Sequence, residues 1–426
     1  MRAIEYPGVG DTLWTGELAN GLAVYVVPRP GFRKKHASLA VNYGGAMRAY
    51  TLGGERHETP AGTAHFLEHK MFDLPEGSAL DILTRRGAEA NAYTSAGRTE
   101  YYFECGERFD ENLELLLKFV STPYFTPESV EKERGIIAQE ILMTEDDPSF
   151  ALYTAAMGAL FERHPLRESV AGTVESIAEI TPEVLYDCHR AFYAPGNMAL
   201  TVCGDVEPEA VAETAARVLG DAKAPAAEAD FGEPEGLAPH ISRVSREMDV
   251  SDPMFICAAK LSCALPRGDS ALRLTTAGSL AARCLFGAGS DFYTSLYASG
   301  ELRSDFFRDV SPMAGTLLFE CGGTASDPDA VCDKIRAELS RAAEAGLDPD
   351  AFERARRADY GAMLRTLGSP DGLCSSLAAA HFGGWSFYEG FGALERVTKA
   401  EADEFVREYL RAERLALALV TPKERT

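Results

Sequence analysis

The chain has few basic residues for its length. Of its 426 residues, 42 are Lys or Arg and 65 are Asp or Glu, so the formal net charge is −23. Nucleic-acid binding needs a basic surface, so this composition predicts no nucleic-acid partner. Long-range attraction would favour basic or neutral ligands over acidic ones, although solubility is the simpler consequence of the charge.

Long apolar runs and paired cysteine motifs are also missing. No uncharged run is long enough to span a bilayer, and the first ten residues contain no apolar signal-peptide core. The nine cysteines are scattered and include no C-x-x-C pair. This pattern is typical of reduced thiols and not of a disulfide framework or a zinc knuckle. We therefore expect no membrane partner and a location in a bacterial cytoplasm.

The most informative stretch is His65-Phe-Leu-Glu-His69. The residues before it predict a helix that begins near Ala61. On a helix, His65 and His69 lie one turn apart on the same face, which suits two nitrogen ligands of one zinc ion. Glu68 lies beside them and could exchange a proton with a water molecule at the metal. The order H-x-x-E-H is the inverzincin signature, although a histidine pair on a helix can also be purely structural.

A second helix is expected to supply a third metal ligand, because catalytic zinc sites use three protein ligands and leave one position for water. Pro127 and the acidic residues after it predict a helix over residues 127–143. Glu133 and Glu140 lie two turns apart on one face of this helix. We interpret Glu140 as the third ligand and Glu133 as a supporting catalytic carboxylate that orients a histidine or the water. The alternative for each is an ordinary solvated glutamate.

Together, the two stretches resemble the pitrilysin/insulinase family of zinc peptidases. In that family, H-x-x-E-H is followed by a downstream E-x6-E on a helix, and here Glu140 lies 140 − 69 = 71 positions after His69. The segments Asn91-Ala-Tyr-Thr-Ser95 and Thr99-Glu-Tyr-Tyr-Phe103 resemble the family's peptide-binding edge strand. With Ala171-Gly-Thr-Val-Glu-Ser-Ile177, the resemblance is strongest to the short bacterial, YmfH-like members.

The resemblance implies a zinc-dependent endopeptidase that hydrolyses short or unfolded peptides. One Zn2+ per chain would be held by His65, His69 and Glu140, with Glu68 as the general base. A peptide substrate would add as a strand beside Asn91 and Ala92. The chain is similar in length to half of the long single-chain enzymes, so the resemblance also implies a homodimer or a heterodimer with a related subunit.

Two alternatives stay open. The chain could be a non-enzymatic scaffold or processing-complex subunit of the same family, or a subunit that is active only with a partner. Inactive members usually lose a ligand or the base, whereas this chain keeps all four residues. A purely structural zinc site would need a fourth protein ligand, and no residue has a spacing that suggests one.

The order of predicted elements indicates an α+β fold with two structurally similar domains, each a mostly antiparallel sheet packed with helices. Residues 1–221 form the expected catalytic domain and residues 240–426 a homologous non-catalytic domain. The Ala-, Pro-, Gly- and acid-rich residues 222–239 are the expected linker. Apolar strands at 197–202 and 414–420 take the same place in the two halves, which predicts a structural duplication.

Overall fold

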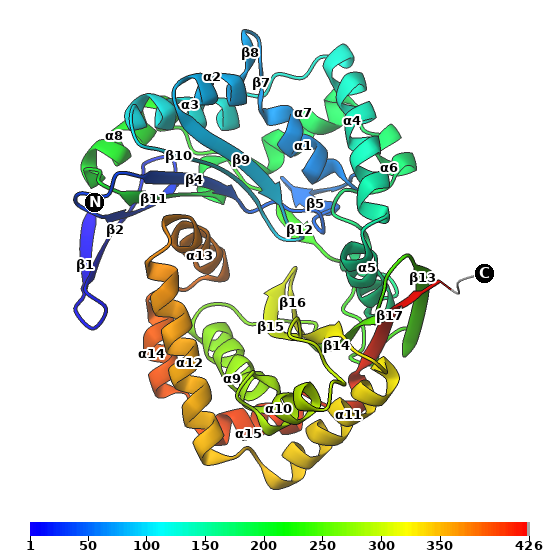
Figure 1. The fold of residues 1–426 in the computed structure, drawn as a ribbon. Helices are drawn as coiled ribbons and strands as arrows, with labels where there is room; N and C mark the ends of the chain where they lie inside the picture. Colours follow the sequence, from blue (N-terminus) through cyan, green and yellow to red (C-terminus); the bar gives the residue numbers. More distant parts are fainter. Residues whose placement is uncertain (424–426) are drawn as a thin grey trace. The chain divides into compact units, whose positions relative to one another are not determined.

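The computed structural model describes residues 1–423 and divides into two compact units (Figure 1). The first unit contains residues 1–141, 169–230 and 364–388, and the second contains residues 142–168, 231–363 and the chain from residue 389 onward. The change from one unit to the other at residues 230 and 231 falls within the expected linker. Residues 142–168 and 364–388, however, each join the unit formed mainly by the other half of the sequence. The compact units therefore do not follow the order of elements along the chain.

The first unit is built on a seven-stranded sheet with the order β1-β2-β3-β11-β4-β10-β9. Its strands are β1 (Arg2–Tyr6), β2 (Asp11–Glu17), β3 (Ala23–Pro28), β4 (Lys35–Val41), β9 (Ala88–Thr94), β10 (Thr99–Cys105) and β11 (Met198–Gly204). All neighbouring strands are antiparallel except β3 and β11. The predicted mostly antiparallel sheet is therefore confirmed, and β9 forms one of its edges.

Helices cover both faces of this sheet. They are α1 (Thr63–Met71), α2 (Ala79–Arg85), α3 (Phe109–Ser121), α4 (Pro127–Glu145, up to Ile141), α6 (Val174–Ala178), α7 (Pro182–Phe192), α8 (Pro208–Leu219) and α13 (Pro370–Gly383). Figure 1 shows α1, α2 and α3 on one face and α13 on the other. The strands β4 and β11 are almost fully buried because both faces of the sheet are covered.

Short strands complete the first unit. The hairpin of β5 (Ala49–Leu52) and β6 (Glu55–Glu58) is extended by β12 (Glu228–Asp230), and β7 (Asp73–Leu74) pairs with β8 (Gly77–Ser78). The expected linker over 222–239 thus contains one short strand, β12. The exposed edge of β5 offers backbone groups that pair with residues 228–230, and a composition signal does not detect such pairing.

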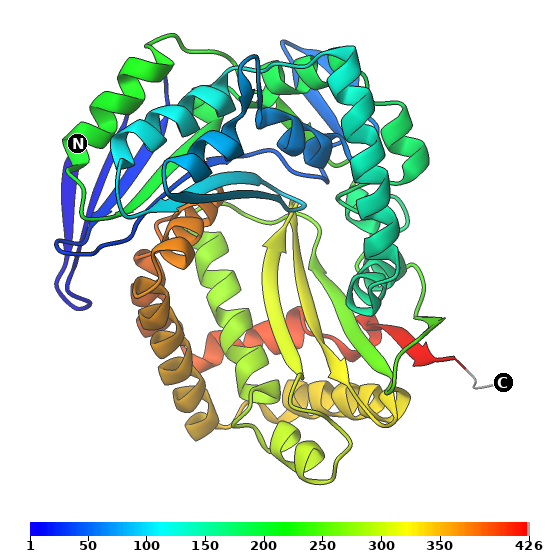
Figure 2. The same ribbon diagram turned by 45° about the horizontal axis from the view of Figure 1, so that its top comes forward.

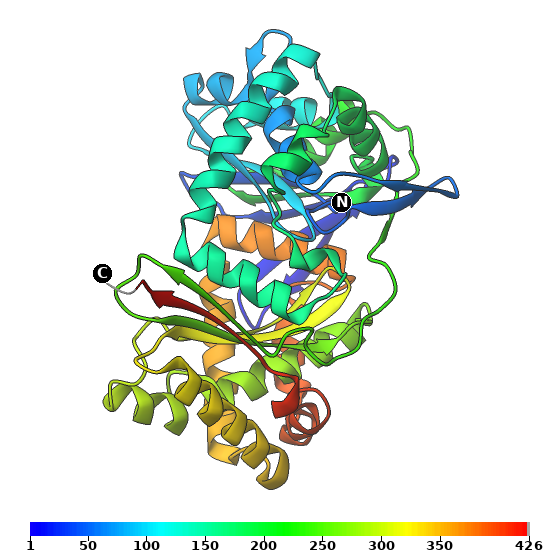
Figure 3. The ribbon, with the colours of Figure 1, turned by 90° about the vertical axis from the view of Figure 1, so that its right-hand side faces the viewer.

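The second unit repeats the arrangement of the first. Its sheet has the order β13-β17-β14-β16-β15, with β13 (Arg243–Met248), β14 (Met254–Ser262), β15 (Phe307–Met313), β16 (Thr316–Thr324) and β17 (Ala416–Pro422). Figure 2 shows β14, β15 and β16 side by side, and Figure 3 shows β17 in dark red beside the green strands. The strand β17 runs parallel to β13 and antiparallel to β14, as β11 does with β3 and β4. The structural duplication is confirmed.

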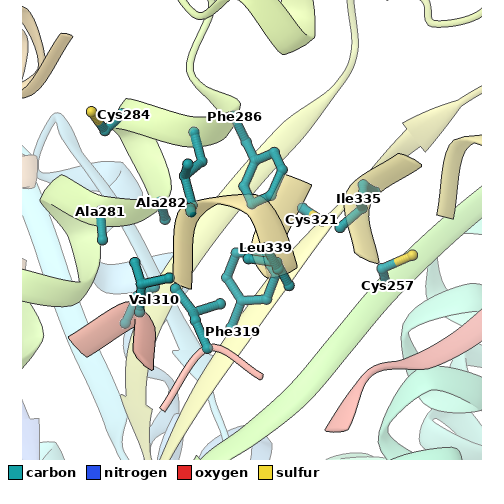
Figure 4. Packing of buried hydrophobic residues seen from close by; sticks show 14 of the residues in the cluster. Cys257, Ala281, Ala282, Cys284, Phe286, Val310, Phe319, Cys321, Ile335 and Leu339 are labelled. Atoms are coloured by element: carbon teal, nitrogen blue, oxygen red, sulfur yellow. The ribbon is translucent and has the colours of Figure 1, made fainter. Parts of the chain in front are cut away.

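The helices of the second unit are α5 (Pro148–Leu160), α9 (Asp269–Phe286), α10 (Asp291–Ala298), α11 (Pro328–Ala345), α12 (Pro349–Leu367, up to Met363), α14 (Glu389–Arg396) and α15 (Lys399–Glu408). Short 3-10 turns lie at Pro165–Arg167, Pro195–Asn197 and Ala412–Arg414. Figure 4 shows Phe286 of α9 and Phe319 of β16 near Ile335 and Leu339 of α11 in one apolar core. At the place that α1 takes in the first unit, α9 contributes core residues and no H-x-x-E-H.

All nine cysteines are unpaired thiols, and eight of them are buried. Cys257 and Cys321 lie in the core of the second unit (Figure 4). Within residues 1–423, no helix is both long and apolar enough to cross a bilayer.

A buried carboxyl in the second unit leads to a prediction about stability. Glu320 lies on β16 opposite Ala258 and Asp309, and only 7% of it is exposed. Burial, and to a smaller extent the Asp309 charge, raises the pKa of Glu320 from 4.5 to about 7. A raised folded-state pKa means that stability is fully present below pH 4.5 and is lost as the pH rises toward 7. We expect Glu320→Gln to raise the melting temperature at pH 8 by a few degrees and to have little effect at pH 5.

Thermal melts of both proteins at the two pH values measure this difference. Glu404→Gln, an exposed change on α15, is the matched control and should show no pH-dependent difference. An equal effect of Glu320→Gln at pH 5 and pH 8 would contradict the prediction.

Candidate metal centre

The start of α1 is fixed by close contact with a distant segment. Gly62 precedes the helix with a φ of 90°, and a Cβ at this position would lie 2.5 Å from the Ala171 carbonyl oxygen. Gly172 is equally close to the Ala61 carbonyl oxygen, and the Ser176 hydroxyl donates to that oxygen at 2.9 Å. The segment 171–177 therefore holds the first turn of α1, which explains why Gly is needed on both sides of the contact.

Side chains from α1 and α4 converge on one point of the first unit. His65 Nε2 lies 3.5 Å from Glu140 Oε1, and His69 Nε2 lies 3.5 Å from Glu140 Oε2. These three residues each place a ligand atom within 4.8 Å of the others, and no other such group occurs among residues 1–423. The i, i+4 spacing on α1 puts both imidazoles on the face that meets α4.

Glu133 contacts a histidine of the cluster. Its Oε1 lies 3.0 Å from His69 Nδ1. When Nδ1 carries the proton and donates it to Glu133, Nε2 keeps its lone pair and points toward Glu140. Glu133 and Glu140 lie two turns apart on the same face of α4, so both carboxylates reach the histidines of α1.

The electrostatics of the cluster favour a bound cation. Burial lowers the pKa of His69, but the hydrogen bond with Glu133 and the charges of Glu68, Glu133 and Glu140 raise it overall. The hydrogen bond with His65 is the largest cause of the lowered pKa of Glu140. Burial raises the pKa of Glu133, but the hydrogen bond with His69 outweighs this effect, and its pKa falls. Three carboxylates around two imidazoles form a site of negative charge.

The donor set fits a catalytic zinc ion. Two imidazole nitrogens and one carboxylate oxygen make three protein ligands, and the cluster in residues 1–423 contains no fourth. Three ligands leave one coordination position for water or substrate, whereas structural zinc sites are closed by four. Other divalent ions bind the same donor types, so these residues fit a divalent transition metal in general. The combination of two histidines and one carboxylate favours zinc among them.

Glu68 and the predicted substrate residues lie at the neighbouring sheet edge. Glu68 is only 7% exposed, and its Oε2 accepts a hydrogen bond of 2.6 Å from the Thr94 hydroxyl of β9. Asn91 and Ala92 also lie on β9, and Asn91 Oδ1 accepts the Ala92 N–H at 2.9 Å. A peptide carbonyl that binds this N–H would have to replace the Asn91 side chain. The sequence motif contained Thr94 but did not reveal its contact with Glu68.

Glu133→Gln is expected to lower zinc affinity by about 10- to 100-fold, because the neutral amide weakens the bond that orients His69. Competition with a chromophoric zinc chelator measures this change. Glu128→Gln, an exposed change on the same helix, is the control and should leave the affinity unaltered. Equal affinities for wild type and Glu133→Gln would contradict this function of Glu133.

Comparison with known proteins identifies the family of this chain. Residues 49–174 match the family described as Insulinase (Peptidase family M16), and residues 179–358 match the domain described as Peptidase M16 inactive domain. The chain is 34% identical to the uncharacterized zinc protease YmfH of Bacillus subtilis (strain 168), over 99% of this chain and 100% of that protein. The chain therefore belongs to the M16 insulinase family, which confirms the resemblance to YmfH-like members.

Solved structures share the fold. The crystal structure of an M16-like protein from Alicyclobacillus acidocaldarius has a TM-score of 0.94 and 33% identity, covering 99% of this chain and 100% of that one. A protease from Helicobacter pylori has a TM-score of 0.78 at 18% identity, over 96% of this chain and 99% of that one. The second likeness shows the two-domain fold alone.

Proposed function

We propose that this protein is a zinc-dependent endopeptidase that hydrolyses short or unfolded peptides. The observation that carries the proposal is the convergence of His65, His69 and Glu140, with Glu68 beside them on α1. Relatives named as zinc proteases support the broader class. The site has the three ligands and the adjacent carboxylate that metal-assisted hydrolysis needs.

Each residue of the site has a function that follows from its position. His65, His69 and Glu140 would hold zinc, which polarises a peptide carbonyl and acidifies water when it is bound. Glu68 takes a proton from the attacking water and returns it to the leaving amine. Glu133 keeps His69 in the tautomer whose Nε2 faces the cluster.

The edge of the first sheet is the proposed substrate platform. β9 is the last strand of the sheet order, so one side of its backbone has no strand partner within residues 1–423. A peptide that adds there gains backbone hydrogen bonds with little demand on its sequence. Asn91 and Ala92 would contact such a peptide close to Glu68, which places a scissile bond near the cluster.

The competing function is that of a non-enzymatic subunit, or of one active only with a partner. The match to an inactive domain keeps this alternative open, but it covers residues 179–358, which exclude the three ligands and Glu68. Homodimerisation or pairing with a related subunit remains a prediction from the family resemblance.

Activity on a pool of fluorogenic peptides tests the proposal. The zinc-loaded protein should cleave members of the pool, and Glu68→Gln should not. A scaffold function would be insensitive to that substitution.

A further inference from the structure

A chain of three hydroxyl contacts links Glu68 to the strand that forms the sheet edge. The Thr94 hydroxyl lies 2.6 Å from Glu68 Oε2 and 3.2 Å from the Thr99 hydroxyl. The Thr99 hydroxyl in turn donates to the Tyr43 carbonyl oxygen at 2.9 Å. Thr94 and Thr99 face each other across β9 and β10.

Counting protons fixes the direction of these contacts. Each hydroxyl has one proton to donate. The Tyr43 carbonyl can only accept, so Thr99 gives its proton there. The carboxylate of Glu68 also accepts, and its 2.6 Å contact is the shorter of the two that Thr94 makes. Thr94 therefore donates to Glu68, and no hydroxyl proton remains for its longer contact with Thr99.

The two oxygens of Glu68 consequently differ. Oε2 is held by Thr94, whereas Oε1 has no hydrogen-bond partner among residues 1–423. Hydrogen bonds to a charged carboxylate are short and strong, so Thr94 restricts rotation of the whole group. Oε1 is then the oxygen that is available to take a proton.

Thr94 also belongs to the backbone that a peptide would meet. The Ser95 N–H donates to the Arg98 carbonyl at 2.8 Å, so Ser95 faces the neighbouring strand. Hydrogen-bonded and non-bonded pairs alternate in an antiparallel ladder, and the backbone of Thr94 and Ala92 therefore points to the open edge. One residue thus presents its main chain to the edge and its hydroxyl to Glu68.

We propose that Thr94 is a positioning residue, whose hydroxyl holds Oε2 of Glu68 so that Oε1 accepts the proton during peptide hydrolysis. This inference rests on the proposed peptidase function. Because the same strand would bind substrate, peptide docking and orientation of the general base depend on one element. Two substitutions of Thr94 separate shape from hydrogen bonding, since Val keeps the shape of Thr without the hydroxyl and Ser keeps the hydroxyl.

Thr94→Val and Thr94→Ser are compared with wild type for kcat, KM, bound zinc and the crystallographic position of Glu68. We expect Thr94→Val to lower kcat by about 10- to 100-fold with KM within about threefold, and to release the Glu68 carboxylate from its position. Thr94→Ser should restore kcat to within about threefold of wild type. Zinc content should stay equal in all three proteins, since Thr94 touches no ligand.

Thr51→Val is the matched control. Thr51 lies on β5, outside the sheet edge proposed to bind substrate. The substitution makes the same change of Thr to Val without removing a contact with Glu68, so kcat should not change.

Three results would overturn the proposal: an unchanged kcat in Thr94→Val, an equal loss in Thr94→Ser, or a Glu68 carboxylate that stays in place in the Thr94→Val crystal structure. If zinc-loaded wild type cleaves no peptide, the peptidase function fails instead. The crystal structures still decide in that case whether Thr94 holds Glu68.

Discussion

Glu68→Gln is expected to lower kcat for peptide hydrolysis by about 10²- to 10⁴-fold while zinc stays bound. The amide keeps the size of the carboxylate and can still accept from Thr94, but it cannot take a proton from water. Glu68 is not one of the three clustered donors, so binding of the metal does not depend on it. Initial rates on a fluorogenic peptide and zinc per chain are measured on the same samples.

The control for this prediction is Glu55→Gln, an exposed glutamate on β6, which should retain wild-type kcat. Equal activity of Glu68→Gln and wild type, at equal zinc content, would remove Glu68 from the mechanism. Loss of zinc in Glu68→Gln would instead make this carboxylate part of the metal site.

Glu140→Ala is expected to weaken zinc binding by about 10²- to 10³-fold and to abolish peptide hydrolysis. One oxygen of Glu140 lies 3.5 Å from His65 Nε2, and the other lies 3.5 Å from His69 Nε2. Without it, two histidines remain, and these make an incomplete catalytic zinc site. Competition with a zinc chelator measures the affinity. We expect Glu140→Ala to lose more zinc affinity than Glu133→Gln, because Glu140 would bind the metal directly whereas Glu133 would only orient His69.

Thermal stability gives an independent readout of the same change. A metal that binds only the folded state raises the melting temperature in proportion to the logarithm of its concentration over Kd. Added zinc should therefore stabilise wild type and should have almost no effect on Glu140→Ala. A zinc-dependent shift of equal size in both proteins would show that Glu140 does not bind the metal.

The sequence predicted the parts of the site that depend on local geometry. The spacings of His65 to His69 and of Glu133 to Glu140 determine which side chains share a helix face, because helical periodicity acts within a few residues. The contact between the histidine face of α1 and the glutamate face of α4 is a long-range contact. Only the family resemblance predicted it. Thr94 was missed because its contact depends on the register of β9 and on where α1 lies.

For the fold, too, the sequence predicted local features but not long-range contacts. The duplication followed from the similar order of predicted elements in the two halves and from apolar runs such as those at 197–202 and 414–420. The exchange of residues 142–168 and 364–388 between the compact units has no local signature, because both stretches form ordinary amphipathic or apolar helices. Pairing of β12 with β5 within the expected linker depends on an available strand edge, which composition does not report.

We propose that the cluster of His65, His69 and Glu140 makes this chain a zinc peptidase. The most direct test is cleavage of a random fluorogenic peptide pool by the metal-free protein, before and after addition of one equivalent of zinc. We expect no cleavage without metal and cleavage once zinc is bound. A fully zinc-loaded protein that cleaves no peptide in the pool would contradict it.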